Sequence, residues 1–136
     1  MSVRVLIVDD NEVFRRPLQR TLEAAGYEVV AAPSGEDALD VLDRSTVDLV
    51  LTDRRLPGMD GVHLTKRIKA RHPALPIVVM TAYGTVESAV EARRYGADDY
   101  LEKPFETPDL LLALQRALEP RQSPARAASS GEPWPT

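Results

Sequence analysis

The alternation of two kinds of segment limits what this chain can fold into more than any other feature. Short runs rich in β-branched residues recur along it, and longer stretches with helical spacing lie between them. The runs cover residues 3–8, 27–31, 47–52, 77–80 and 98–101. A short apolar run of this kind indicates a strand that is buried on both faces. Five such strands alternating with five helices predict a single α/β domain with a parallel sheet covered on both sides.

The helical stretches carry start and stop signals. Ser34 followed by Asp37 is typical of a capping box. The sequence Thr107-Pro108-Asp109 supplies a cap, a first-turn proline and a first-turn acid. Two glycines stand where helices should end, namely Gly26 and Gly96. These signals support helical interpretations of the segments that lie between the strands.

Pro17 conflicts with the first helical stretch. A proline inside a helix removes a backbone hydrogen bond and costs up to about 3 kcal/mol. Phe14, Leu18 and Leu22 nevertheless lie on one face at helical spacing. The sequence therefore predicts either a helix that is kinked at Pro17 or one that begins later than Asn11.

The length of 136 residues fits one domain, which we predict over residues 1–119. Residues 120–136 are rich in proline, alanine and serine and predict a flexible tail or linker that contains the only tryptophan, Trp134. A net charge of −4 argues against nucleic-acid binding by the domain itself. The absence of cysteine excludes disulfides and thiolate sites. No apolar run is long enough for a membrane span or a signal peptide, so we expect a cytoplasmic protein without membrane contact.

Polar residues stand where the predicted strands end, and ligands of parallel sheets bind at that edge. These residues are Asp9, Asp10, Asp53, Thr81 and Lys103. Three neighbouring carboxylates would repel one another, which makes sense if a hard divalent cation lies among them. Magnesium prefers such oxygen ligands, and manganese is an alternative. A lysine and a threonine hydroxyl beside the cation suit the oxygens of a phosphoryl group.

Each of these residues also has a structural explanation when it is considered alone. Asp9 or Asp10 could cap a helix, and Asp53 could belong to the turn that contains Pro57 and Gly58. Thr81 ends a strand, where threonine is common, and Lys103 could be a solvated surface lysine. Only their joint occurrence at four strand ends favours a site.

Four motifs, taken in order, resemble the receiver domain of two-component response regulators. They are Val8-Asp9-Asp10, Leu51-Thr52-Asp53 with the following Leu56-Pro57-Gly58-Met59-Asp60-Gly61, Met80-Thr81-Ala82, and Tyr100-Leu101-Glu102-Lys103-Pro104-Phe105. The likeness covers residues 3–118 and is closest to receivers of nitrogen-regulation-type transcriptional activators. It implies a flavodoxin-like, doubly wound (βα)5 fold with strand order 2-1-3-4-5.

The resemblance implies that Asp53 is the phosphoacceptor. It also implies that Asp10, Asp53 and the backbone carbonyl of Arg55 bind the metal directly, while Asp9 acts through water. Thr81 would bond the phosphoryl group, and Lys103 would pair first with the carboxylate and then with the phosphate.

Further implications concern switching and output. The bond before Pro104 is expected to be cis, and Tyr100 resembles the aromatic residue that moves with Thr81. The fourth helix, fifth strand and fifth helix would then form the output face, which could also support a homodimer. Bulky residues at Arg55 and Tyr83 predict slow loss of the phosphoryl group. Such a domain is not an enzyme in the usual sense, because it catalyses only its own phosphorylation and slow dephosphorylation.

The implied partners are a sensor histidine kinase or a phosphotransfer protein, and a downstream effector. His63 and His72 lie in or just after the third predicted helix, away from the strand ends, so neither is a predicted ligand or phosphodonor. A hydrolase of the haloacid-dehalogenase type is a remote alternative. In that family the nucleophile ends the first strand, whereas here Asp9 and Asp10 follow the first predicted strand and Asp53 follows the third. A flavodoxin-like cofactor binder would need a glycine-rich loop after that strand. Two contexts stay open: the receiver of a transcriptional activator, or a single-domain phosphorelay intermediate.

Overall fold

The computed structural model describes residues 2–82 and 85–119. In these ranges five strands alternate with five helices, as predicted. The strands are β1 (Arg4–Val8), β2 (Glu28–Ala32), β3 (Leu49–Asp53), β4 (Ile77–Thr81) and β5 (Asp99–Glu102). The helices are α1 (Glu12–Ala24), α2 (Gly35–Arg44), α3 (Gly61–Arg71), α4 (Val86–Arg94) and α5 (Thr107–Leu118). The predicted tail over residues 120–136, Trp134 and Tyr83 lie outside the described residues.

All strands pair in parallel, in the order β2-β1-β3-β4-β5. This order confirms the doubly wound fold that the resemblance implied. The chain leaves β1 toward β2 on one side and later returns to add β3 on the other side of β1. The ends of β1 and β3 therefore meet at the topological switch point, where ligands of such sheets bind.

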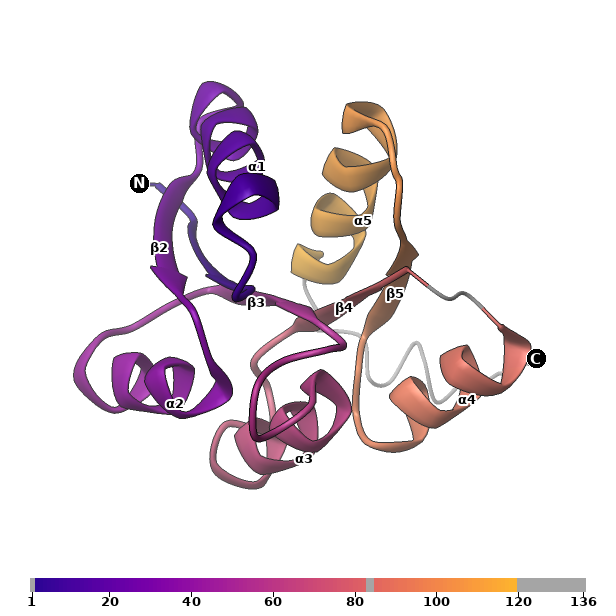
Figure 1. The fold of residues 1–136 in the computed structure, drawn as a ribbon. Helices are drawn as coiled ribbons and strands as arrows, with labels where there is room; N and C mark the ends of the chain where they lie inside the picture. The colour runs from indigo at the N-terminus through magenta and orange to yellow at the C-terminus, as the bar shows by residue number, and fades with distance from the viewer. Residues whose placement is uncertain (1, 83–84, 120–136) are drawn as a thin grey trace.

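The helices form two layers around the sheet (Figure 1): α1 and α5 cover one face, and α2, α3 and α4 cover the other. Alternate residues of each strand feed two hydrophobic clusters. Val5, Ile7 and Leu51 pack on the α1–α5 side, whereas Leu6 and Val8 pack on the opposite side. Strands β1, β3 and β4 are buried on both faces apart from one end residue each of β1 and β3, which explains why their runs are apolar without alternation.

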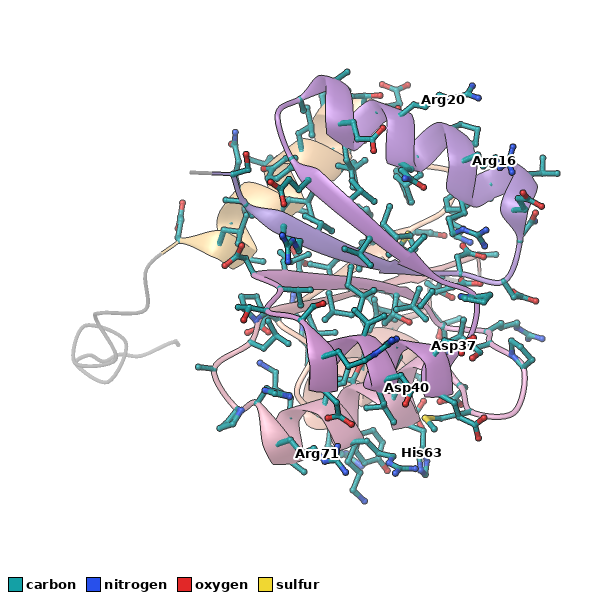
Figure 2. All side chains as sticks on the ribbon, turned by 90° about the vertical axis from the view of Figure 1, so that its left-hand side faces the viewer. Arg16, Arg20, Asp37, Asp40, His63 and Arg71 are labelled. Atoms are coloured by element: carbon teal, nitrogen blue, oxygen red, sulfur yellow. The ribbon has the colours of Figure 1, made fainter. Side chains whose placement is uncertain are left out.

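The outer faces of the helices carry charged side chains. Figure 2 shows Arg16 and Arg20 along α1, Asp37 and Asp40 on α2, and Arg71 on α3, all away from the sheet. None of the described helices combines the length and the apolar character needed to cross a membrane.

The predicted helix boundaries are mostly confirmed. The Ser34 hydroxyl accepts the backbone N–H of Asp37 at 3.1 Å. Gly26 and Gly96 follow α1 and α4 with φ of 101° and 109°, a conformation that glycine adopts without steric penalty. In both cases two backbone N–H groups bond back to the last turn, so each helix ends in a Schellman motif.

Two helix starts add detail to the sequence interpretation. Helix α1 begins at Glu12, directly after Asn11, and continues through Pro17. The lost hydrogen bond belongs to the carbonyl of Val13, a residue that is 83% exposed, and water can replace it there. Thr107 is not the cap of α5 but its first residue, because the carbonyl of Glu106 already accepts the N–H of Leu110 at 3.1 Å.

Candidate functional site

Three carboxylates meet at the carboxyl edge of the sheet. Asp9 and Asp10 follow β1 directly, and Asp53 is the last residue of β3. Val8 pairs with Thr52 in the sheet, so the register brings Asp9 beside Asp53. One oxygen from each of Asp9, Asp10 and Asp53 lies within 4.8 Å of the others. The structure thus unites the acids that the sequence selected.

Asp9 is a fully buried carboxylate with several partners. Its Oδ1 accepts the backbone N–H of Asn11 at 2.9 Å, and its Oδ2 lies 3.3 Å from Lys103 Nζ. Arg15 donates from Nη1 to the Asp9 carbonyl at 2.7 Å. A buried charge is tolerated when it is paired and hydrogen-bonded, so these contacts explain how Asp9 stays in place.

Lys103 joins the buried Asp9 to the partly buried Asp53. Its Nζ lies 3.2 Å from Asp53 Oδ1 as well as 3.3 Å from Asp9 Oδ2. The backbone holds the residue too, because its N–H donates to the Thr81 carbonyl at 2.6 Å. The Lys103–Pro104 bond is cis. The ammonium also lies 3.9 Å from the centre of the Phe14 ring. The lysine is therefore held from three sides.

The pKa of Asp53 is raised above the ordinary carboxyl value. Burial is the main cause, and the negative charge of Asp9 adds to it. The charge and hydrogen bond of Lys103 and a backbone hydrogen bond from Arg55 act in the opposite direction. One lysine thus compensates the neighbouring carboxylates only in part. A donor set of carboxylate oxygens with excess negative charge fits a hard divalent cation such as magnesium.

Gly61 packs against the end of β3 in a way that the sequence interpretation missed. Its N–H donates to the Arg54 carbonyl at 2.7 Å, and a Cβ on this residue would overlap the carbonyl oxygen of Asp53. The hydroxyl of Thr52 donates to the same Asp53 carbonyl at 3.0 Å. In the sequence Gly61 stood only as the last residue of the motif that follows Asp53, and its spacing did not indicate this close approach.

The two predicted switch residues lie on neighbouring strands. Thr81 ends β4, is 2% exposed, and lies beside the pairing of Asp53 with Met80. Tyr100 of β5 pairs with Val79 of β4. Its side chain is partly buried and packs against the cluster beneath α2, α3 and α4.

The side chain of Arg54, the residue after Asp53, lies on the face of the sheet that α4 covers. Its Nη2 lies 2.7 Å from Glu91 Oε1 in α4, and its Nη1 is buried with no hydrogen-bond partner among the described residues. The next residue, Arg55, is exposed. Figure 2 shows His63 on the outer side of α3.

Comparisons with known proteins agree with this geometry. Residues 5–115 match the family model of the response regulator receiver domain. The response regulator protein FleR of Pseudomonas aeruginosa is 50% identical over 111 residues, 82% of this chain and 24% of FleR. The DNA-binding transcriptional regulator NtrC of Escherichia coli is 39% identical over 130 residues, 93% of this chain and 28% of NtrC. The chain thus spans about a quarter of the length of these curated relatives.

Solved structures give the same result. The receiver domain of NtrX from Brucella abortus superposes with a TM-score of 0.78 at 40% identity, covering 85% of this chain and 98% of that one. A CheY-like receiver from Methanospirillum hungatei reaches a TM-score of 0.82 at 31% identity, covering 88% and 95%. The similarity to NtrC and FleR also confirms the predicted likeness to receivers of nitrogen-regulation-type activators. This chain belongs to the response regulator receiver domain family of two-component systems.

Proposed function

We propose that this domain is a phosphorylation switch and that Asp53 is its phosphoacceptor. The observation that supports this most directly is the ammonium of Lys103, which lies 3.2 Å from Asp53 and 3.3 Å from Asp9. The side chain of Asp53 is 13% exposed, so a donor can reach it from solvent. The donor would be a histidine of a sensor kinase or of a phosphotransfer protein, and the proposal places the reaction in the cytoplasm.

The reaction is a transfer between two nucleophiles. A carboxylate oxygen of Asp53 attacks phosphorus, and the bond from phosphorus to the donor histidine nitrogen breaks, returning its electron pair to that nitrogen. Lys103 then pairs with an oxygen of the bound phosphoryl group, and the Thr81 hydroxyl donates to another. The product stays attached, so the domain is a substrate that assists its own modification and not an enzyme with turnover.

A magnesium ion, or a manganese ion in its place, would bind beside Asp53. Asp10, Asp53 and the Arg55 carbonyl would hold it directly, and Asp9 would do so through water. The ion supplies positive charge that offsets the charge of the carboxylates and of the incoming phosphoryl group.

The phosphorylated state would act on a downstream effector through the face formed by α4, β5 and α5. Thr81 and Tyr100 would carry the signal to this face. A homodimer through the same face is one form that the output could take. Because NtrC is a DNA-binding transcriptional regulator, we propose control of transcription as the output, with a phosphorelay intermediate as the second candidate.

The chemistry is tested by incubating the protein with acetyl phosphate and magnesium. We expect a mass gain of one phosphoryl group, located on Asp53, and no gain for Asp53→Asn. Asp40→Asn, which removes an exposed acid on α2, is the matched control and should be modified like the parent. Modification at another residue, or an unchanged yield in Asp53→Asn, would contradict the assignment. Turnover of a generic phosphomonoester would instead favour the hydrolase alternative.

We further propose that the phosphoryl group is long-lived. Arg55 is an exposed residue two positions after the acceptor, where a bulky side chain can shield the acyl phosphate from water. The proposal assigns the same role to Tyr83, which lies outside the described residues. A shorter half-life in Arg55→Asn and Tyr83→Glu is expected, and an unchanged half-life in both would remove the idea.

A further inference from the structure

The ring of Phe14 is the third group around the Lys103 ammonium, after the carboxylates of Asp9 and Asp53. The ammonium lies 3.9 Å from the ring centre, well inside the distance of about 6 Å at which a cation is attracted to an aromatic face. The Lys103 side chain is only 18% exposed, so solvent screens this attraction weakly. The contact joins α1 to the segment after β5, which lie on the same side of the sheet.

Phe14 itself is held firmly. It lies in the first turn of α1, where its N–H donates to the Asn11 carbonyl at 3.2 Å. Its ring meets the ring of Phe105 edge to face, with centroids 6.0 Å apart and an interplanar angle of 86°. Phe105 follows the Lys103-Pro104 segment, so the same element carries the lysine and the second ring.

The aromatic face differs from the other two partners in one respect. Asp9 and Asp53 attract the ammonium with full charges, whereas a phenyl ring attracts it through its quadrupole and carries no net charge. A ring can therefore hold a flexible lysine without neutralising it and without competing for its protons. This is useful where the lysine must next pair with a phosphoryl oxygen.

We propose that Phe14 is a positioning residue, whose ring face holds the Lys103 ammonium between Asp9 and Asp53 and thereby sets the rate of phosphoryl transfer to Asp53. The inference rests on the proposed function. It assigns a role to a side chain that touches no reacting atom and acts through Lys103.

A purely structural role makes a different prediction. Phe14 also packs on the α1–α5 cluster and lines a small apolar depression with Val13, Pro17 and Leu18. If only packing mattered, the rate would depend on the volume of the side chain at position 14 and not on the electron density of its ring.

Stepwise fluorination separates the two roles. Phe14 is replaced with 4-fluoro-, 3,5-difluoro- and 3,4,5-trifluorophenylalanine in the full chain, which weakens the quadrupole while the volume changes little. The rate of Asp53 phosphorylation by acetyl phosphate is measured at saturating magnesium. We expect a progressive loss that reaches about tenfold in the trifluoro protein, the range of a partly desolvated cation–π contact. The same series at Phe105, whose ring contacts Phe14, is the matched control and should change the rate less than about twofold.

Two conventional variants and one spectroscopic signal accompany the series. Phe14→Tyr keeps an aromatic face and should retain the parental rate within about twofold, whereas Phe14→Leu keeps an apolar contact and should lose about tenfold. The proton resonances of the Lys103 side chain should shift upfield in the parent, because they lie over the ring, and lose this shift in Phe14→Leu. Urea unfolding of each variant checks that the substituted protein is still folded.

The outcomes are distinguishable. A flat rate across the Phe14 series, equal effects at Phe14 and Phe105, or a parental rate in Phe14→Leu would overturn the inference and leave the proposed function intact. A parent protein that is not phosphorylated at all would overturn the proposed function itself.

Discussion

Asp53, the proposed phosphoacceptor, is a residue whose burial costs the folded protein stability at neutral pH. Its raised pKa, caused first by burial and then by Asp9, means that the folded protein binds a proton there more tightly than the unfolded chain. Stability therefore falls as the pH rises from the ordinary carboxyl range through the raised pKa, and the full loss is present above it.

Replacing this carboxyl tests the sign of the effect. In EDTA at pH 7, Asp53→Asn should unfold at a higher urea concentration than the parent, because the amide carries no charge to bury. Below the ordinary carboxyl pKa the parent is protonated as well, so the difference should vanish. Asp40→Asn, an exposed acid on α2, should show neither effect. A destabilised Asp53→Asn at pH 7 would show that the Lys103 pair outweighs burial.

Gly61 leaves no room for a side chain behind the backbone of Asp53. A Cβ there would overlap the Asp53 carbonyl oxygen, and that oxygen belongs to the backbone of a central strand. Gly61→Ala should therefore lower the free energy of unfolding by about 2–3 kcal/mol, as overpacking does elsewhere. Gly35→Ala is the matched control, since Gly35 is likewise the first residue of a helix. Its Cβ would meet only side chains, the flexible Met59 at 3.1 Å from Sδ and Leu64 Cδ1 at an ordinary 3.6 Å, so a change below about 1 kcal/mol is expected in urea unfolding. Equal losses in both proteins would contradict the packing argument.

Helix α1 contains a proline, which is unfavourable inside a helix. Pro17 is exposed and cannot donate to the Val13 carbonyl. Alanine would restore that hydrogen bond and gain about 3 kcal/mol of helix propensity, reduced by about 1 kcal/mol because the unfolded chain becomes more flexible. Pro17→Ala should therefore stabilise the protein by about 2 kcal/mol in thermal and urea unfolding. Arg16→Ala, one position earlier on the exposed side, should stay within about 0.5 kcal/mol. Destabilisation of Pro17→Ala would show that the apolar depression needs the proline ring.

The starts and ends of the helices could largely be predicted from the sequence because the residues that determine them are close together in the chain. Ser34 and Asp37, or Gly26 and the turn before it, interact within a few residues, so their spacing in the sequence is also their spacing in space. The cap of α5 was misplaced by one residue because Thr107 and Glu106 compete for the same position. Which of the two residues becomes the cap depends on the direction in which the chain leaves β5.

The whole molecule brings together the proposed metal ligands from two strands that are remote in sequence. Unfolding separates Asp9 and Asp10 from Asp53, so an ion that needs all of them should stabilise the fold. At a magnesium concentration about 100 times the dissociation constant, the expected gain is about 2.7 kcal/mol. Thermal unfolding in EDTA and in magnesium measures it. Asp10→Asn should lose most of the gain and Asp40→Asn none, whereas an equal gain in both would point to a different ion site.

The sequence by itself determined the α/β alternation, the parallel sheet and the five polar residues at the strand ends, because periodicity and strand-end position depend on near neighbours. Its resemblance to receivers supplied the strand order. Only the tertiary structure decided which adjacent acid is buried: Asp9 is enclosed and Asp10 is exposed, although both are aspartates after one strand.

The same holds for contacts across elements. Arg54 meets Glu91, Lys69 meets Asp98, and the ring of Phe14 lies over Lys103. These partners are separated by tens of residues, and their meeting depends on how each helix is rotated and shifted on the sheet. Hydrophobic periodicity indicates which face of a helix turns inward, but not which side chain of another element it will meet. That choice is made by side-chain packing in three dimensions.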